Sequence, residues 1–303
     1  MLLRRLTVLC FMLPLLITPA AHSQFVRAKG TEIVDASGKP LSIHGISIGN
    51  WMVLEGYFWH FGSVNTYQKD VEAVFEDLLG PTHAQNFLYQ WRQNLITKAD
   101  VHRIKQDGFN TIRVPLHTKY LKTDDDEGFK LIDQLVKWCR EEHIYVILML
   151  ESGVGGTTGE ASDDGPGYPW LLKDAGMQTY VNKAWQRIAR HYKNEPIILG
   201  YDLLNEPLLW TGYLYLEDLL EPEYRRLTEA IRKVDTNTCS FCNRHVDALV
   251  NSASPSMTIA STAITATTLL RVRSFLSSTW PSARNIKCRS SSLRFTRRGR
   301  QSG

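Results

Sequence analysis

The sequence predicts an α/β fold built on a parallel sheet. Three apolar segments with strand character are FNTIRVPL (residues 109–116), YVILML (145–150) and IILGYDLL (197–204). Between them lie segments of ten or more residues whose apolar positions recur at helical spacing. Strands that alternate with helices of this length are typical of βα units, in which the strands run parallel.

The remaining elements follow in order along the chain. The lead-in over residues 24–40 has a turn at DASGKP, and LSIHGISIGN (41–50) predicts a first strand because it alternates and is rich in β-branched residues. The pattern is helical from Asn65 to Gln106, and within it Thr97 to Asp100 (TKAD) form a capping box for a helix that ends at Gly108. Further helices are predicted in residues 128–144, 177–194 and 222–237.

The first 23 residues are predicted to be a signal peptide. Arg4 and Arg5 precede the apolar run LTVLCFMLPLLI, and small residues follow it in PAAHS, which favours cleavage after Ser23. A membrane anchor is the alternative, but the run is short for a bilayer and no stop-transfer segment follows. We therefore expect a secreted protein, extracellular or periplasmic, without membrane contact after removal of the signal.

Charge divides the rest of the chain into an acidic body and a basic tail. Of the 35 basic residues, two lie in the signal and nine follow Asp247, whereas all 31 acidic residues lie between residue 24 and Asp247. The body thus holds 24 basic groups against 31 acidic ones, a net charge of −7. A basic composition alone is weak evidence that the tail binds nucleic acid or an acidic glycan, so no nucleic-acid partner is expected.

The cysteines do not form a disulfide framework. Cys139 lies alone in a helical segment and reads as a small buried hydrophobe, while Cys239, Cys242 and Cys288 all lie in the tail. The C-x-x-C of CSFC together with His245 supplies three ligands, short of the four of a structural zinc site. No metal and no cofactor are therefore predicted.

The strand over residues 197–204 runs directly into Asn205, Glu206 and Pro207. In (β/α) barrels the catalytic groups lie at the C-terminal ends of the strands. Pro207 has no N–H group and ends the strand's hydrogen bonding. The segment is therefore suited to place an acid at the mouth of a barrel, although a loop glutamate in another α/β fold would give the same pattern.

Four motifs follow one another along the chain: GISIGNWMVLEGYFW (45–59), GFNTIRVP (108–115), GGTTGEASDDGPGYPWLL (155–172) and GYDLLNEP (200–207). Together they resemble glycoside hydrolase family 5, retaining glycosidases of the cellulase and exo-β-glucanase type, and the likeness extends over residues 25–237. The resemblance implies an α/β fold of the (β/α)8 TIM barrel type, incomplete, with about the first half recognisable. The domains expected are a signal at 1–23, a partial barrel at 24–238, and a basic Ser/Thr/Arg-rich tail without recognisable fold at 239–303.

The resemblance also implies roles for individual residues. Glu206 matches the general acid/base, and Asn205 matches the residue that hydrogen-bonds the sugar's 2-hydroxyl. Arg113 matches the arginine that orients the second carboxylate, with a purely structural ion pair as the alternative. Glu55 and Trp51 match positions that line the first sugar subsite.

Chemistry supports these assignments. A retaining glycosidase needs two carboxyl groups about 5 Å apart, one to protonate the leaving oxygen and one to attack. The acid must keep its proton near neutral pH, which burial and a nearby like charge can achieve. The aromatic residues among positions 51–59 could offer flat faces to sugar rings or form a core cluster, since aromatic rings bury well in either place; they are Trp51, Tyr57, Phe58 and Trp59.

Two departures from the family pattern stand out. Met149 and Glu151 occupy the places of an Asp and a His at the end of the third barrel strand, so Glu151 adds an acid to the expected substrate-binding site. The nucleophile, an H-x-Y strand and a late Trp are expected after residue 238, yet no Glu follows Glu229.

We interpret the sequence after residue 238 as the product of a shifted reading frame. Codons for residues 257–268, MTIASTAITATT, read from their third base must begin with Asp and can encode D-D-R-L-D-S-N-Y-C-Y-H. Family members often carry an Asp-Asp run and then a strand with aromatic residues and His at about this place.

The function predicted from the sequence is a secreted, monomeric glycosidase that hydrolyses β-glucans or related oligosaccharides with retention. The alternatives are a non-catalytic sugar-binding relative and a basic interaction protein whose barrel half is only a scaffold. A second carboxylate opposite Glu206 separates the enzyme from the first alternative, and salt-sensitive binding to polyanions would support the second.

Overall fold

The computed structural model describes residues 25–30, 32–59, 68–159, 163–208, 211–242 and 257–262. Its strands are β1 (Arg27–Lys29), β2 (Glu32–Val34), β3 (Ile43–Ile48), β4 (Thr111–His117), β5 (Tyr145–Ser152), β6 (Ile198–Asp202), β7 (Cys239–Phe241) and β8 (Met257–Thr262). The α-helices are α1 (Gln68–Leu79), α2 (Pro81–Leu95), α3 (Lys98–Gln106), α4 (Glu127–Glu142), α5 (Ala175–Tyr192) and α6 (Leu220–Arg232). Short 3-10 helices are η1 (Gly56–Trp59), η2 (Thr118–Tyr120), η4 (Trp170–Leu172) and η5 (Thr211–Leu219).

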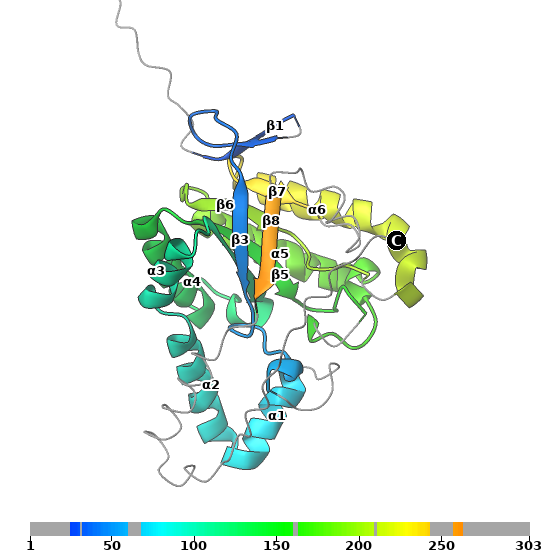
Figure 1. Cartoon of the computed structure of the whole chain (residues 1–303). Coiled ribbons are helices and arrows are strands. Elements are labelled where there is room, and N and C mark those ends of the chain that lie inside the picture. The colour runs from blue at the N-terminus through cyan, green and yellow to red at the C-terminus, as the bar shows by residue number, and fades with distance from the viewer. Residues whose placement is uncertain are drawn as a thin grey trace, which may run out of the picture.

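The central sheet is parallel and has the strand order β7-β6-β5-β4-β3-β8. Helices α4, α5 and α6 connect β4 to β5, β5 to β6 and β6 to β7, so the strands from β4 to β7 are joined by successive βα units (Figure 1). The predicted α/β fold is confirmed as a partial (β/α)8 barrel. In the described part of the chain the edge strands β7 and β8 do not pair with each other.

The larger hydrophobic core lies between the sheet and the helices. Side chains alternate between the two faces of a strand, and alternate residues of β4, Ile112, Val114 and Leu116, belong to this core. On α5, Trp185 is fully buried and its Nε1 donates to the carbonyl of Leu203 at 3.2 Å. Burial of a large apolar side chain contributes roughly 1.5–3 kcal/mol, so this face holds most of the stabilising contacts.

A smaller cluster lies on the other face of the sheet, toward the N-terminal ends of the strands. Ile43, Ile147 and Leu199 pack there with Val26, which lies beside the antiparallel hairpin of β1 and β2. The ring of Phe241 packs so closely on Gly200 that an added Cβ would lie 2.2 Å from a ring carbon. A glycine is therefore required at this position of β6. The β1–β2 hairpin was not predicted from the sequence pattern.

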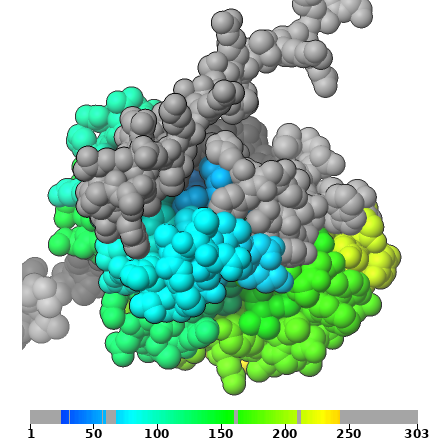
Figure 2. Space-filling model, turned by 90° about the horizontal axis from the view of Figure 1, so that it is seen from below, coloured from blue at the N-terminus to red at the C-terminus, as the bar shows by residue number. Residues whose placement is uncertain are grey.

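The helical pattern predicted from Asn65 to Gln106 divides into α1, α2 and α3. Gly80, with φ of 77°, and Pro81 at the first position of α2 separate the first two helices. The predicted capping box is confirmed: Asp100 Oδ2 accepts from Thr97 N at 2.8 Å, and α3 begins at Lys98. Helices α1 and α2 extend beyond the C-terminal ends of the strands, and seen from below they lie in front of that end (Figures 1 and 2).

Two segments of the tail, residues 239–303, form strands of the central sheet. Strand β7 continues the sheet beside β6, and β8 pairs with β3 in parallel along its whole length, from Ile43↔Met257 to Ile48↔Thr262. The exposed edge of a sheet offers unpaired N–H and C=O groups that another extended segment can satisfy. The signal segment and the rest of the tail, including His245 and Cys288, lie outside the described residues.

Candidate functional site

The ends of three neighbouring strands bring the predicted site residues together. Arg113 lies on β4, Glu151 near the end of β5, and Asn205 and Glu206 follow β6. The strands are parallel and in contact, with Arg113 opposite Ile147 and Met149 opposite Asp202. Their C-terminal ends therefore point the same way, which is the end at which barrel enzymes carry their catalytic groups.

A network of charged hydrogen bonds fixes the centre of this site. Arg113 donates from Nε and Nη2 to Asp202 Oδ2 at 2.9 and 2.6 Å, and Nη2 also donates to Asn205 Oδ1 at 2.9 Å. Asn205 in turn donates from Nδ2 to Glu151 Oε1 at 2.9 Å. The amide of Asn205 is thus held in one orientation between the Arg113 guanidinium and the Glu151 carboxyl group. Sequence reasoning missed Asp202, whose only signal was an acid inside an otherwise apolar strand.

Glu206 occupies an unusual backbone conformation. Its φ is 41° and that of Leu208 is 57°, both in the left-handed region that non-glycine residues rarely adopt. Two hydrogen bonds hold the turn from either side: Asn205 N donates to the carbonyl of Leu150 at 2.9 Å, and Leu208 N donates to that of Thr157 at 3.0 Å. Strained backbone that the surroundings hold in place is frequent at functional sites. Here the backbone conformation sets the direction of the Cα–Cβ bond of Glu206.

Acidic side chains crowd this end of the sheet. Burial raises the pKa of Glu151 well above its usual value, and the nearby charges of Glu55, Glu206 and Asp163 act in the same direction, while Arg113 opposes them. Such an environment favours a carboxyl group that keeps its proton at higher pH.

Glu55 enters this acidic group from the segment after β3. Its carboxylate approaches Gly49 so closely that an added Cβ would lie 3.1 Å from Oε1. Its backbone N donates to Asn50 Oδ1 at 3.1 Å. The predicted residues Glu55, Glu151 and Glu206 therefore share one acidic environment, and a side chain at position 49 would crowd the first of them.

Asp163 organises the glycine-rich loop that follows β5. Its side chain is buried and accepts from Thr157 N at 2.5 Å, Thr158 N at 2.8 Å, Thr158 Oγ1 at 3.0 Å and Gly165 N at 2.8 Å. Because Thr157 also accepts from Leu208 N, the loop and the Glu206 turn are joined. Sequence reasoning missed this residue as well, and its signal was the acidic pair in SDDG.

The aromatic residues near β3 are placed differently from the prediction for Trp51. That side chain is only 2% exposed, belongs to the hydrophobic core, and donates from Nε1 to the Arg92 carbonyl at 2.7 Å. Trp59 is half-buried, donates to Asn50 Oδ1 at 3.0 Å, and packs against Phe75 and Trp91 with ring centroids 5.1 and 4.7 Å away.

Trp51 thus has almost no ring surface open to a sugar, and its indole N–H is bonded to the backbone of α2. The side chain of Phe58 is half-buried, and that of Tyr57 lies outside the described residues.

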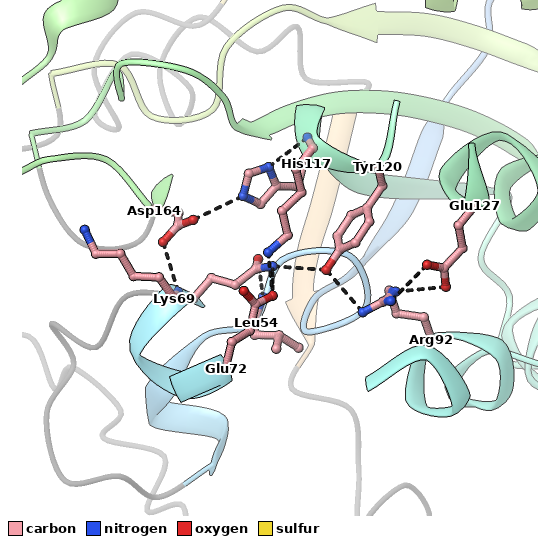
Figure 3. Close-up of polar contacts among 10 residues, drawn as sticks. Leu54, Lys69, Glu72, Arg92, His117, Tyr120, Glu127 and Asp164 are labelled. Atoms are coloured by element: carbon pink, nitrogen blue, oxygen red, sulfur yellow. Dashed lines mark hydrogen bonds and ion pairs between the residues drawn. The ribbon is translucent and has the colours of Figure 1, made fainter. Parts of the chain in front are cut away.

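A set of polar contacts fastens α1 and α2 to the end of β4 (Figure 3). Gln68 of α1 and Arg92 of α2 both donate to the hydroxyl of Tyr120, at 3.2 and 3.1 Å. Arg92 also forms a two-point ion pair with Glu127 of α4, with both distances 2.9 Å. Paired bonds of this kind are strong and directional, so they hold the two helices in place above the strand ends.

Within the described ranges, no group of three or more His, Cys, Asp or Glu residues is arranged to bind a metal ion. The described helices also include none with the length and apolar character that a membrane crossing requires.

Comparison with known proteins identifies the family. The model for cellulase, glycosyl hydrolase family 5, matches residues 65–248, more than half of the chain. A "Beta-xylosidase" of Phanerodontia chrysosporium is 29% identical over 224 residues, covering 72% of this chain and 45% of its own length. A "Probable glucan 1,3-beta-glucosidase A" of Aspergillus fumigatus is 27% identical over 210 residues, covering 66% of this chain and 49% of its own.

Among solved structures, rutinosidase from Aspergillus niger is 14% identical with a TM-score of 0.55, covering 66% of this chain and 62% of its own, which supports the fold alone. The chain spans about half the length of the curated relatives it matches. The match of the family model over most of the partial barrel carries the conclusion: this chain belongs to glycosyl hydrolase family 5.

Proposed function

We propose that this protein is a secreted glycosidase that hydrolyses β-linked glucans or related oligosaccharides with retention of configuration, with Glu206 as the general acid/base. The observation that carries the proposal is the position of Glu206 beside the Arg113–Asn205–Glu151 network at the C-terminal ends of the strands. Barrel enzymes place their chemistry at this end, and a glycosidase needs a positioned carboxyl group there.

In this mechanism Glu206 protonates the glycosidic oxygen as the bond to the leaving group breaks, and later takes a proton from the attacking water. Asn205 uses one N–H for Glu151 and has a second available for a sugar hydroxyl. Arg113 fixes the carbonyl end of the same amide and is itself held by Asp202. Substrate hydrogen bonds from such a fixed group can strengthen in the transition state.

The substrate class rests on the curated relatives. Their names specify glucan 1,3-beta-glucosidase and beta-xylosidase activity, both of which act on β-linked sugars. A β-glucan or a β-linked oligosaccharide is therefore the proposed substrate, bound by a secreted monomer. Glu55 and Glu151, which lie near Glu206 at the open strand ends, are the proposed contacts to the first sugar unit.

The chain as written has no candidate for the second carboxylate, the nucleophile of the retaining mechanism. Retention needs a nucleophile across the sugar ring from Glu206, and no acidic residue follows Asp247. Glu151 comes from β5, the strand next to β6, so it lies beside the acid. We propose that the nucleophile is encoded in the shifted frame after codon 238.

A direct experiment separates these possibilities. The chain as written and a version with the frame restored after codon 238 are expressed side by side and assayed on β-1,3- and β-1,4-glucans. We expect turnover only from the restored version, which should also unfold at a higher urea concentration because more of the barrel is present. Robust turnover by the chain as written would refute the frameshift proposal and require a different nucleophile.

A non-catalytic sugar-binding protein is the second candidate for the chain as written. The observation that favours it is the missing second carboxylate in a chain that retains Asn205, Glu206 and Arg113. It predicts that the chain as written binds oligosaccharides without hydrolysing them.

A further inference from the structure

A cavity at the C-terminal end of β4 is lined by several cationic side chains. It has a volume of about 640 Å³ and lies between the end of β4, the start of the loop after β5, and α5. We call it the β4–α5 pocket, and the residues that matter most for its chemistry are His117, Lys122, Gly153, Asp164, Lys183 and Arg187. Ligand pockets for small molecules commonly have volumes of about 300–1,000 Å³, so a sugar unit fits this size range.

The acidic groups around this pocket are already engaged. Asp164 accepts from His117 Nε2 at 3.3 Å and from Lys69 N at 3.1 Å, as Figure 3 shows. His117 also accepts from Lys119 N at 3.2 Å through Nδ1, and burial lowers its pKa, which favours the neutral ring. The side chain of Lys119 forms an ion pair with Glu72.

Three other cations are compensated only in part: Lys122 lies near Asp126, whose carboxylate also accepts from Thr123 Oγ1 at 2.6 Å. Lys122 and Lys183 are exposed, and neither forms a salt bridge within the described part of the chain. Arg187 donates from Nη1 to the Leu121 carbonyl at 2.8 Å, and its Nε is 3.8 Å from Asp124, a side chain 75% exposed. A pair so exposed is weakened by water and salt, so the pocket keeps an excess of positive charge.

This positive charge contrasts with its surroundings, because residues 24–247 carry a net charge of −7. The pocket is also close to the proposed chemistry along the chain: Gly153, in its wall, follows Glu151 by two residues. Half-buried Tyr180 lines the same cavity and offers a ring against which a sugar could pack. A cationic cavity of this kind concentrates anionic ligands and orients them.

We propose that the β4–α5 pocket binds a sugar unit that carries a carboxylate, so that the natural substrate is a glycan with acidic substituents. The inference rests on the proposed function in that the ligand is a sugar. Lys122 and Lys183 are the predicted partners of the carboxylate, and Arg187 lies in the same wall.

The test is equilibrium binding to the 303-residue chain by calorimetry at low ionic strength, which needs no turnover. The probes are methyl β-D-glucuronide, methyl β-D-glucoside and inorganic sulfate. We expect the glucuronide to bind at least tenfold more tightly than the glucoside or sulfate, a difference of about 1.4 kcal/mol. The preference should weaken as salt is added, since the partners are exposed charges.

Variants test whether the preference for the glucuronide arises in the β4–α5 pocket. The double variant Lys122→Gln/Lys183→Gln should lose the tenfold preference, whereas Lys130→Gln/Lys137→Gln, the same change at exposed positions of α4, should keep it. All these lysines are on the surface, so a urea midpoint common to all variants separates lost binding from lost folding.

Equal affinity for glucuronide and glucoside, or a preference that survives the pocket variant, would overturn the proposal. Sulfate binding as tightly as glucuronide would overturn the assignment to a sugar. Failure of the restored chain to hydrolyse glucans would contradict the proposed function and would leave these binding results to be judged separately.

Discussion

Asp202→Asn tests whether the buried ion pair holds the site together. The guanidinium of Arg113 makes two of its three observed bonds to Asp202, and the two side chains are only 14% and 8% exposed. Breaking a buried ion pair by removing one partner costs about 3–5 kcal/mol. Asparagine keeps one acceptor oxygen and Arg113 keeps Asn205, so we expect a smaller loss, about 2 kcal/mol, similar to a lost hydrogen bond to a charged group.

Urea unfolding measures this loss. With a slope of about 2 kcal/mol per M, a destabilisation of about 2 kcal/mol lowers the midpoint by about 1 M. The matched control is Asp107→Asn, the same substitution in the exposed Arg103–Asp107 pair, whose side chains are 73% and 45% exposed. An exposed pair contributes roughly 0–1 kcal/mol, so its midpoint should move much less.

The urea midpoints of Asp202→Asn and Asp107→Asn are expected to differ. If Asp202→Asn and Asp107→Asn shift the urea midpoint equally, burial of the Arg113–Asp202 pair does not increase its contribution to the free energy of unfolding. The double variant Arg113→Met/Asp202→Leu should cost less than the two single changes added together, because no charge is then left alone.

Three further outcomes are expected. In the frame-restored protein Glu206→Gln should reduce hydrolysis of unactivated glycosides by about 10²–10⁴-fold, and much less for substrates whose leaving group needs no proton; equal losses would show that Glu206 is not the proton donor. Because burial and Glu55 raise the pKa of Glu151 in the folded state, the protein loses stability as pH rises from about 4.5 through that pKa. Glu151→Gln should remove this part of the dependence, which urea unfolding from pH 4 to 8 would detect. Trp51→Ala should destabilise the fold by about 3–5 kcal/mol, and a fully stable variant with weaker sugar binding would contradict its place in the core.

The sequence was sufficient to predict the elements whose cause is local. The capping box at Thr97 and Asp100 depends on neighbours three residues apart, and the strands around Arg113 and Glu206 depend on short apolar runs. Because the strands are parallel, their order along the chain also predicted that Arg113, Glu151 and Glu206 would share one end of the sheet. These inferences need no knowledge of distant contacts.

Features that depend on distant contacts could not be predicted in the same way. Asp202 gains its importance from Arg113, which lies 89 positions away in the chain, and the buried indole of Trp51 is bonded to the carbonyl of Arg92, 41 positions away. A tryptophan that covers a core and one that faces a sugar have the same sequence signature. The position of β8 beside β3 likewise arises from the open edge of the sheet.

The bonds around Asp163 have a consequence for how this enzyme family could vary its loops. The loop after β5 and the turn that carries Glu206 are linked by hydrogen bonds, because Asp163 accepts from Thr157 N and the Thr157 carbonyl accepts from Leu208 N. We therefore expect an insertion or deletion between Gly155 and Asp163 to displace Glu206, the proposed acid, as well as the loop. Loop exchange between relatives should succeed only when both segments are transplanted together.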